Sequence, residues 1–180
     1  MIDLLHEAEA VPASYPAAPS GLSIQAAALE ATAIWQRIEA YTKTRYTARQ
    51  VVWTLEGCEG LDWNPPLSPV ASYSAQKWES GLWVTVAIPQ GPIGLCLPSD
   101  GIFRVTAQVG AGTPPSAINE AFRRLAEYVS DEPDRAGVSS YSVNMGNAVQ
   151  ESYQRSAAHV ARAIQYSGAA DLLRPYRRLK

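Results

Sequence analysis

The chain has 180 residues, a length that fits one domain with an ordinary hydrophobic core and leaves room for an extended arm. Apolar residues make up 47% of the sequence and charged residues 18%, which excludes bulk disorder and is consistent with surface buried against other chains. The opening MIDLLHEAEAVPASYP lacks a basic start and a long apolar core, so no signal peptide is predicted. No apolar run reaches the roughly 18 residues needed to cross a membrane, and a cytoplasmic protein is expected.

The charge is unevenly distributed along the chain. Residues 151–180 carry six basic and two acidic side chains, a local charge of +4, so the other 150 residues sum to −6. Such asymmetry favours a basic segment that docks on something acidic, either a protein groove or nucleic acid. A solvated basic end without a partner is the alternative.

The first half of the chain begins with a proline-rich segment and a helix. Three prolines in residues 1–20 prevent a continuous helix there, and an extended segment is predicted. A helix is then predicted over residues 22–43, because apolar side chains recur at spacings of three and four. These side chains are Ile24, Ala28, Ala31, Trp35, Ile38 and Tyr41.

In the middle of the chain, apolar and polar side chains alternate with a period of two. This pattern predicts a small antiparallel sheet of about five strands. The Glu79-Ser80-Gly81 turn is expected to join the second strand to the third, with glycine at the residue that needs a positive φ. The Asp-Gly pair at 100–101 is expected to join the last two strands into a second hairpin. The predicted strands are residues 47–55, 70–77, 82–88, 93–97 and 102–109.

A second helix is predicted from Pro115 to about residues 131–133, because Ile118, Phe122, Leu125 and Val129 recur at helical spacing. Beyond it, the polar residues 134–155 suit an extended arm that orders on binding, and short helical pieces are predicted over 156–167 and 169–174. The predicted fold is α+β: two main helices packed with a small antiparallel β-sheet, plus an extended, partly helical C-terminal arm. The predicted segments are a proline-rich stretch (1–20), a core (21–133) and a docking arm (134–180).

The sequence contains no catalytic constellation. It has no nucleophile elbow, P-loop or zinc-protease helix, and its two histidines, His6 and His159, have no pattern of ligands beside them. Cys96 lies in an apolar run and Cys58 in a loop, without the spacing of a metal site. We therefore expect no enzymatic activity, no cofactor and no metal.

Three further features have a functional and a plainer interpretation. Glu56, Glu59 and Asp62 cluster in one loop and could bind a hard cation, although loop acids are usually just solvated. The Gly110-x-Gly112 turn lies between a strand and a helix, but the prolines after it remove N–H groups that a phosphate site would use. Core packing explains most of the five tryptophans, with Trp63 expected to be exposed.

The end of the C-terminal arm combines apolar anchors, tyrosines and arginines, which are the residue types of interface hot spots. We predict a partner interface there; packing of Leu172 and Leu173 on the chain's own core is the alternative. The predicted interface residues are Tyr166, Leu172, Leu173, Arg174, Pro175, Tyr176, Arg177 and Arg178.

The order of these pieces resembles the head-to-tail connector (adaptor) family of long-tailed phages and of gene transfer agents. The resemblance rests on the junction from helix to strand with Thr44-Arg45-Tyr46 and Trp53, and on the Leu67-Ser-Pro69-Val70 entry into a strand. It rests further on the strand–Gly–Pro–helix joint at 105–125 and on the ending LLRPYR. The chain departs from the family in its proline-rich residues 11–20, which replace the usual first helix.

The resemblance implies a structural virion protein in the neck, assembled in the host bacterial cytoplasm as a dodecameric ring. The ring would dock on the portal protein through its C-terminal arm, and its opposite face would receive the tail-side stopper or terminator protein. DNA would pass through the channel without sequence-specific binding, and no membrane is involved. A neck stopper or tail terminator is the alternative, and a small ligand-binding domain at Glu56–Asp62 is a third hypothesis.

Overall fold

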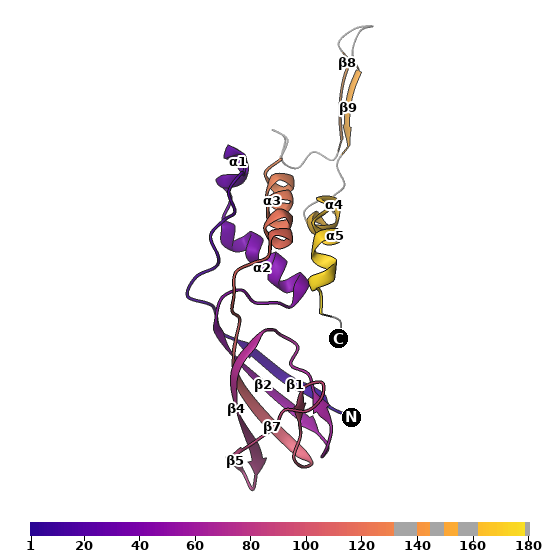
Figure 1. Ribbon diagram of the computed structural model, residues 1–180. Helices are drawn as coiled ribbons and strands as arrows, with labels where there is room; N and C mark the ends of the chain where they lie inside the picture. Colours follow the sequence, from indigo (N-terminus) through magenta and orange to yellow (C-terminus); the bar gives the residue numbers. More distant parts are fainter. Residues whose placement is uncertain (132–139, 145–149, 155–161, 179–180) are drawn as a thin grey trace. The chain divides into compact units, whose positions relative to one another are not determined.

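The computed structural model describes residues 1–131, 140–144, 150–154 and 162–178. The chain divides into two compact units, and its main elements are labelled in Figure 1. The sheet unit contains Met1–Pro16, Glu39–Pro114 and Tyr176–Lys180, and the helical unit contains Ala17–Ile38 and Pro115–Pro175. The mixed α+β fold class predicted from the sequence is confirmed. Among the described helices, none combines the length and the hydropathy that a membrane crossing requires.

The sheet unit is built on a five-stranded sheet in the order β1-β2-β7-β4-β5, with every neighbouring pair antiparallel. Its strands are β1 (Asp3–Glu9), β2 (Arg49–Gly57), β4 (Val70–Glu79), β5 (Leu82–Val86) and β7 (Gly101–Val109). Two short strands, β3 (Asp62–Trp63) and β6 (Leu95–Cys96), pair with each other outside this sheet. In the centre of the sheet, Trp53 on β2 lies opposite Val105 on β7.

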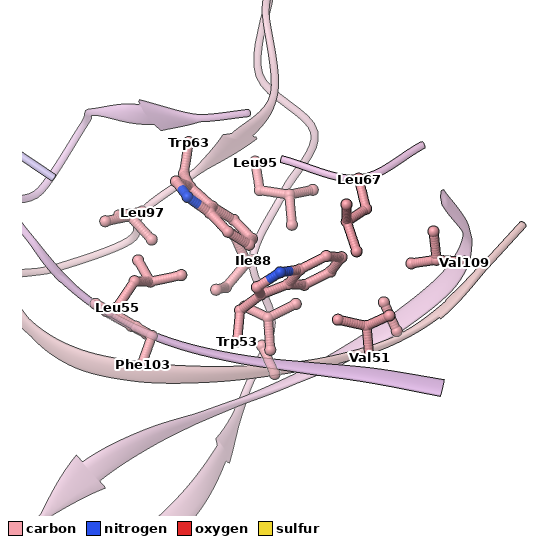
Figure 2. Packing of buried hydrophobic residues seen from close by; sticks show 13 residues of the cluster. Val51, Trp53, Leu55, Trp63, Leu67, Ile88, Leu95, Leu97, Phe103 and Val109 are labelled. Atoms are coloured by element: carbon pink, nitrogen blue, oxygen red, sulfur yellow. The ribbon is translucent and has the colours of Figure 1, made fainter. Parts of the chain in front are cut away.

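One face of the sheet carries the hydrophobic core (Figure 2). Alternate side chains of β2 are buried there because one face of the strand is covered, as its period of two predicts. The cover comes from the segments around β3 and β6. Trp63 packs edge-on against Trp53 at a centroid distance of 5.3 Å, and Leu67, Leu95 and Leu97 are buried beside it. The expectation that Trp63 is exposed is therefore wrong: the indole is 7% exposed because it covers the core.

The sheet confirms one predicted hairpin and corrects the other. β4 and β5 form a hairpin whose turn holds Ser80 at φ 49° and Gly81 at φ 86°, so glycine fills a positive-φ position as expected. The predicted pairing of residues 93–97 with 102–109 is wrong, because β6 pairs with β3 while β7 lies between β2 and β4. The fifth strand of the sheet is instead β1, in the segment predicted to be extended but not to pair in the sheet.

The helical unit packs several helices around α3 (Ser116–Ser130). Its buried face includes Ile118, Phe122 and Leu125, as the helical spacing predicts, and Trp35 packs on Phe122 at a centroid distance of 4.9 Å. The other helical elements are α1 (Ile24–Ala27), α2 (Ala31–Thr42), α4 (Ala163–Tyr166), α5 (Ala169–Leu173) and the 3-10 turn η2 (Arg174–Tyr176). α2 and η2 cross from one unit into the other along the chain.

One helix prediction needs correction, and another lies partly outside the described residues. The single helix expected over residues 22–43 is two helices, α1 and α2, with a break at residues 28–30. No glycine or proline marks that break in the alanine-rich sequence, so periodicity alone could not find it. Of the helix expected over 156–167, the structure describes α4 at its end, while residues 155–161, including His159, lie outside the described residues.

The segment predicted as an extended arm contains two strands. β8 (Ser140–Asn144) and β9 (Gln150–Gln154) pair antiparallel, with Tyr141 opposite Tyr153. An extended backbone agrees with the prediction, whereas the local pairing was not foreseen, because the polar sequence shows no apolar alternation. Ordering of this arm on binding stays a prediction.

Candidate interaction site at the C-terminal segment

The predicted interface residues lie on four consecutive pieces of the chain. Tyr166 ends α4 and is 49% exposed, while Leu172 and Leu173 lie on α5. The rest follow in the 3-10 turn η2 and directly after it: Arg174, Pro175, Tyr176, Arg177 and Arg178. The division between the units falls after Pro175, so the last three residues of this set belong to the sheet unit.

The α5 part of this set belongs partly to the core of the helical unit. α5 packs on α3, and both Leu173 and Ala169 are 0% exposed. Self-packing, the alternative that the sequence left open, therefore describes Leu173. Leu172 is half-buried, and Arg174 and Pro175 are exposed. A partner that binds this region would meet Tyr166, Arg174 and Pro175, not Leu173.

The chain end, Tyr176–Arg178, contacts the sheet unit. The Arg178 guanidinium donates hydrogen bonds to Asn64 Oδ1 at 2.8 Å and to the carbonyl oxygen of Pro65 at 3.1 Å. Its backbone N–H donates to the carbonyl oxygen of Thr42 at 3.2 Å. The Arg177 guanidinium lies 5.4 Å from the ring centroid of Tyr41, within cation–π range. We call Tyr41, Thr42, Asn64 and Pro65 the arginine seat.

A cleft of about 600 Å³ borders the arginine seat within the sheet unit. Arg178, Asn64 and Pro65 form part of its wall, and most of the remaining lining is small or uncharged. The remaining lining residues are Ser68, Val70, Ala71, Ser72, Tyr73, Gln90, Ile93, Gly94 and Leu95. None of these described lining residues is acidic, so the oxygens that they offer to a cation are backbone, amide and hydroxyl oxygens.

The sheet unit also contains a buried ion cluster of Glu9, Glu39, Arg45 and Arg49. Arg45 donates to both oxygens of Glu9 at 2.6 and 2.8 Å, and Arg49 Nη1 lies 3.0 Å from Glu9 Oε1 and 2.9 Å from Glu39 Oε2. The side chains of Arg49 and Glu39 are each 3% exposed. The cluster joins β1 to the end of α2 and to the start of β2.

The electrostatics of the buried ion cluster favour the charged form of Glu9. Burial acts to raise the pKa of Glu9, but hydrogen bonds and charge from Arg45, and then from Arg49, outweigh it and hold that pKa below its ordinary value. Burial, with smaller contributions from Tyr176 and Glu39, raises the pKa of Tyr46 to about 12. The sequence analysis missed this cluster because its members come from residues 9 to 49 and share no local motif.

The loop acids and the glycine turn have structural explanations. The Asp62 carboxylate accepts a hydrogen bond from the backbone N–H of Ile93 at 3.3 Å, while Glu56 and Glu59 are exposed. Within the described ranges, no group of three or more His, Cys, Asp or Glu side chains could hold a metal ion. Gly110 adopts φ 101°, where a Cβ would collide with the carbonyl oxygen of Thr47, so glycine is needed for a close turn.

The hairpin at one edge of the sheet exposes apolar side chains on both of its faces: Trp78, opposite Trp83, lies on one face, and Leu82 and Val84 lie on the other. Trp78, Leu82 and Val84 are 44%, 69% and 45% exposed, and β5 contains no charged residue. Trp78 and Trp83 pack edge to face at 5.0 Å, and Arg104 lies 4.4 Å from the ring centroid of Trp83. Natural edge strands are usually protected by charge, proline or a bulge, and β5 has no charge or proline.

Comparisons with known proteins find structural likeness and no sequence match. No protein-family model matches the chain, and no curated protein matches it. A chain from the neck of an empty gene transfer agent particle, computed with C6 symmetry, aligns over 98% of this chain and 97% of its own, with 16% identity and a TM-score of 0.53. A chain from the virion of a native gene transfer agent particle aligns over 83% and 75%, with 18% identity and a TM-score of 0.47. The chain therefore has a fold similar to that of the neck chain over nearly its full length.

Proposed function

We propose that this protein is a structural component of the neck of a tailed phage or gene transfer agent particle. It forms a dodecameric head-to-tail adaptor ring that docks on the portal and receives the tail-side stopper or terminator protein. The carrying observation is the likeness to a chain of a gene transfer agent neck, which extends over 98% of this chain and 97% of that one. The sequence resembles the head-to-tail adaptor family of phages and gene transfer agents, and this resemblance supports the adaptor role independently.

The charge distribution supports a channel through which DNA passes. Residues 1–150 sum to −6, and a surface of that sign repels phosphates, so DNA can move along it without binding. The basic end of the chain suits an acidic groove on a partner. Subunit contacts in a ring also need exposed apolar surface, which the β4–β5 hairpin supplies at Trp78, Leu82 and Val84.

The portal-binding residues that we propose are the members of the predicted set other than the buried Leu173. Tyr166 and Arg174 are exposed and of the types that dominate interface energies. Leu173 contributes indirectly, because its burial against the helical core holds α5 and the residues after it in place. A truncation after residue 150 would remove α4 and α5 together with this packing, so point variants are the better test.

The portal contact is tested by exchanging Arg174 for glutamine and measuring retention of the protein on purified portal rings. Loss of an interface arginine is expected to weaken retention roughly tenfold, about 1.4 kcal/mol. Arg124→Gln is the matched control, because Arg124 on α3 is also exposed and forms an ion pair with Glu120, at 3.1 Å on the same helix. Equal retention of the two variants would contradict the assignment. Binding to tail-side proteins but not to portal would favour the stopper or terminator instead.

A further inference from the structure

The loop that carries Asn64 and Pro65 of the arginine seat is anchored in the hydrophobic core by the residues that flank it in sequence. Asn64 and Pro65 lie between two buried residues, Trp63 at 7% and Leu67 at 1% exposure. Gly94 allows the backbone of this loop to approach closely, since a Cβ there would collide with the carbonyl group of Trp63. The backbone that carries both acceptors, the Pro65 carbonyl oxygen and the Asn64 side chain, is therefore held by its packing on the core.

A second backbone connection ties this loop to the other half of the arginine seat. Ser68 N–H donates to the carbonyl oxygen of Lys43 at 3.2 Å, and its own carbonyl accepts from Arg45 N–H at 2.7 Å. Thr42, whose carbonyl oxygen receives the backbone N–H of Arg178, is adjacent to Lys43. The acceptors from residues 42, 64 and 65 thus form one rigid set.

The acceptors of the seat match the donors of an arginine. Two carbonyl oxygens and one amide oxygen receive three N–H groups of Arg178, and an aromatic ring faces the next guanidinium. Carbonyl oxygens accept the fork of a guanidinium without a carboxylate beside it. The contact stays partly solvated, because Asn64 is exposed and Arg178 is half-buried.

We infer that the arginine seat is a binding site for the chain's own C-terminal arginines, and that the seat and the portal compete for them. Arg177 and Arg178 belong to the predicted portal interface and, in this structure, contact the sheet unit. A guanidinium that donates to Asn64 and Pro65 cannot donate to a portal carboxylate with the same N–H groups. The portal half of this inference rests on the proposed function; the seat itself does not.

The seat is tested without any partner by following trypsin trimming of the chain end. Trypsin cleaves after Arg177 and Arg178, and intact mass gives the rate at which the last residues are lost. Asn64→Ala removes one acceptor of a charged donor, so trimming should become roughly three- to tenfold faster. Gln90→Ala is the matched control, because Gln90 lines the same cleft without a hydrogen bond to Arg178. Equal trimming rates for the two variants would contradict the inference that the arginine seat binds the C-terminal arginines.

The competition is tested by measuring retention of the same variants on portal rings. Asn64→Ala frees the chain end and should strengthen retention by a similar factor, whereas Arg178→Ala should weaken it. Faster trimming combined with unchanged or weaker retention of Asn64→Ala would overturn the competition and leave the seat intact. If the wild-type protein did not bind portal at all, the proposed function would be contradicted. The trimming rates would still show whether the arginine seat binds the C-terminal arginines.

Discussion

The two ends of the chain contact the sheet unit by opposite means. At the N-terminal end, β1 pairs with β2 along its length, and Glu9 enters the buried ion cluster with Arg45 and Arg49. At the C-terminal end, Arg178 donates hydrogen bonds to a few oxygens, and its side-chain acceptor, Asn64, remains exposed. The two arginines make the difference: the side chains of Arg45 and Arg49 are 8% and 3% exposed and pair with a charged Glu9, whereas Arg178 is half-buried and its acceptors are uncharged.

The difference assigns a separate role to each end. β1 completes the edge of the sheet beside β2 and is held there by charges that cannot leave without a large loss of stability. The C-terminal arginines are held by a few partly solvated hydrogen bonds and a cation–π contact, which contribute little enough free energy for contacts with a protein partner to replace them. The N-terminal contact is thus structural, and the C-terminal contact is available for exchange.

Removing a cation from the buried ion cluster should have the largest effect. Arg49→Ala leaves Glu39 nearly fully buried with one charged partner fewer, and we expect a loss of about 3–5 kcal/mol in the free energy of unfolding. Urea denaturation followed by tryptophan fluorescence measures it. Arg104→Ala, which removes an arginine from hydrogen bonds to Gln76, is the control and should lose about 1 kcal/mol. Similar losses of unfolding free energy for both variants would show that the buried ion cluster contributes no more to stability than the hydrogen bonds of Arg104.

Truncating the buried leucine of α5 should come next. Leu173→Ala leaves a cavity against α3, and we expect a loss of about 2–4 kcal/mol in unfolding free energy. The neighbouring Leu172 is half-buried, so Leu172→Ala should lose less than about 1.5 kcal/mol. Thermal and urea unfolding of both variants check this order. A larger loss at Leu172 would mean that α5 packs through its other face.

Acid should weaken the N-terminal contact selectively. The pKa of Glu9 in the folded protein lies below the ordinary 4.5, so the carboxylate adds stability above about pH 4.5 and loses it as pH falls through the folded pKa. Glu9→Gln should therefore be less stable than wild type at pH 7, and the difference should shrink toward pH 3. Urea midpoints at several pH values measure it. A difference that is constant with pH would argue against a charged Glu9 in the cluster.

The smallest effect on stability should follow release of the chain end. Arg178→Ala removes hydrogen bonds that are partly solvated, so the free energy of unfolding should fall by only about 0.5–1 kcal/mol. The same urea experiment compares it with Arg49→Ala. A loss as large as that of Arg49→Ala would remove the distinction between a structural end and an exchangeable end.

Local patterns in the sequence predicted most of the regular elements. β2 and β7 follow from the alternation of apolar side chains, and α3 follows from four apolar residues at helical spacing. These signals are local, because one face of each of these elements contacts the core. β1 escaped prediction because all seven of its residues are exposed, so its pairing with β2 leaves no apolar alternation to detect.

Features that depend on distant residues could not be predicted in this way. The pairing of β6 with β3, instead of with the next strand along the chain, is decided by the cover over the core, where Trp63 and Leu95 pack. The residue types of the C-terminal segment indicated an interface, but not that Leu173 is buried or that Arg178 contacts Asn64. The buried ion cluster likewise brings together three separate stretches of sequence.

Electron microscopy of the purified protein, with and without portal rings, tests the proposed function most directly. The proposal predicts a ring of about twelve subunits stacked coaxially on the portal, as the resemblance to the adaptor family implies, because head-to-tail contacts of this kind close on themselves. Arg174→Gln should reduce the fraction of portals that carry a ring, and Arg124→Gln should not. Portal rings that stay bare at saturating protein concentration would contradict the adaptor assignment.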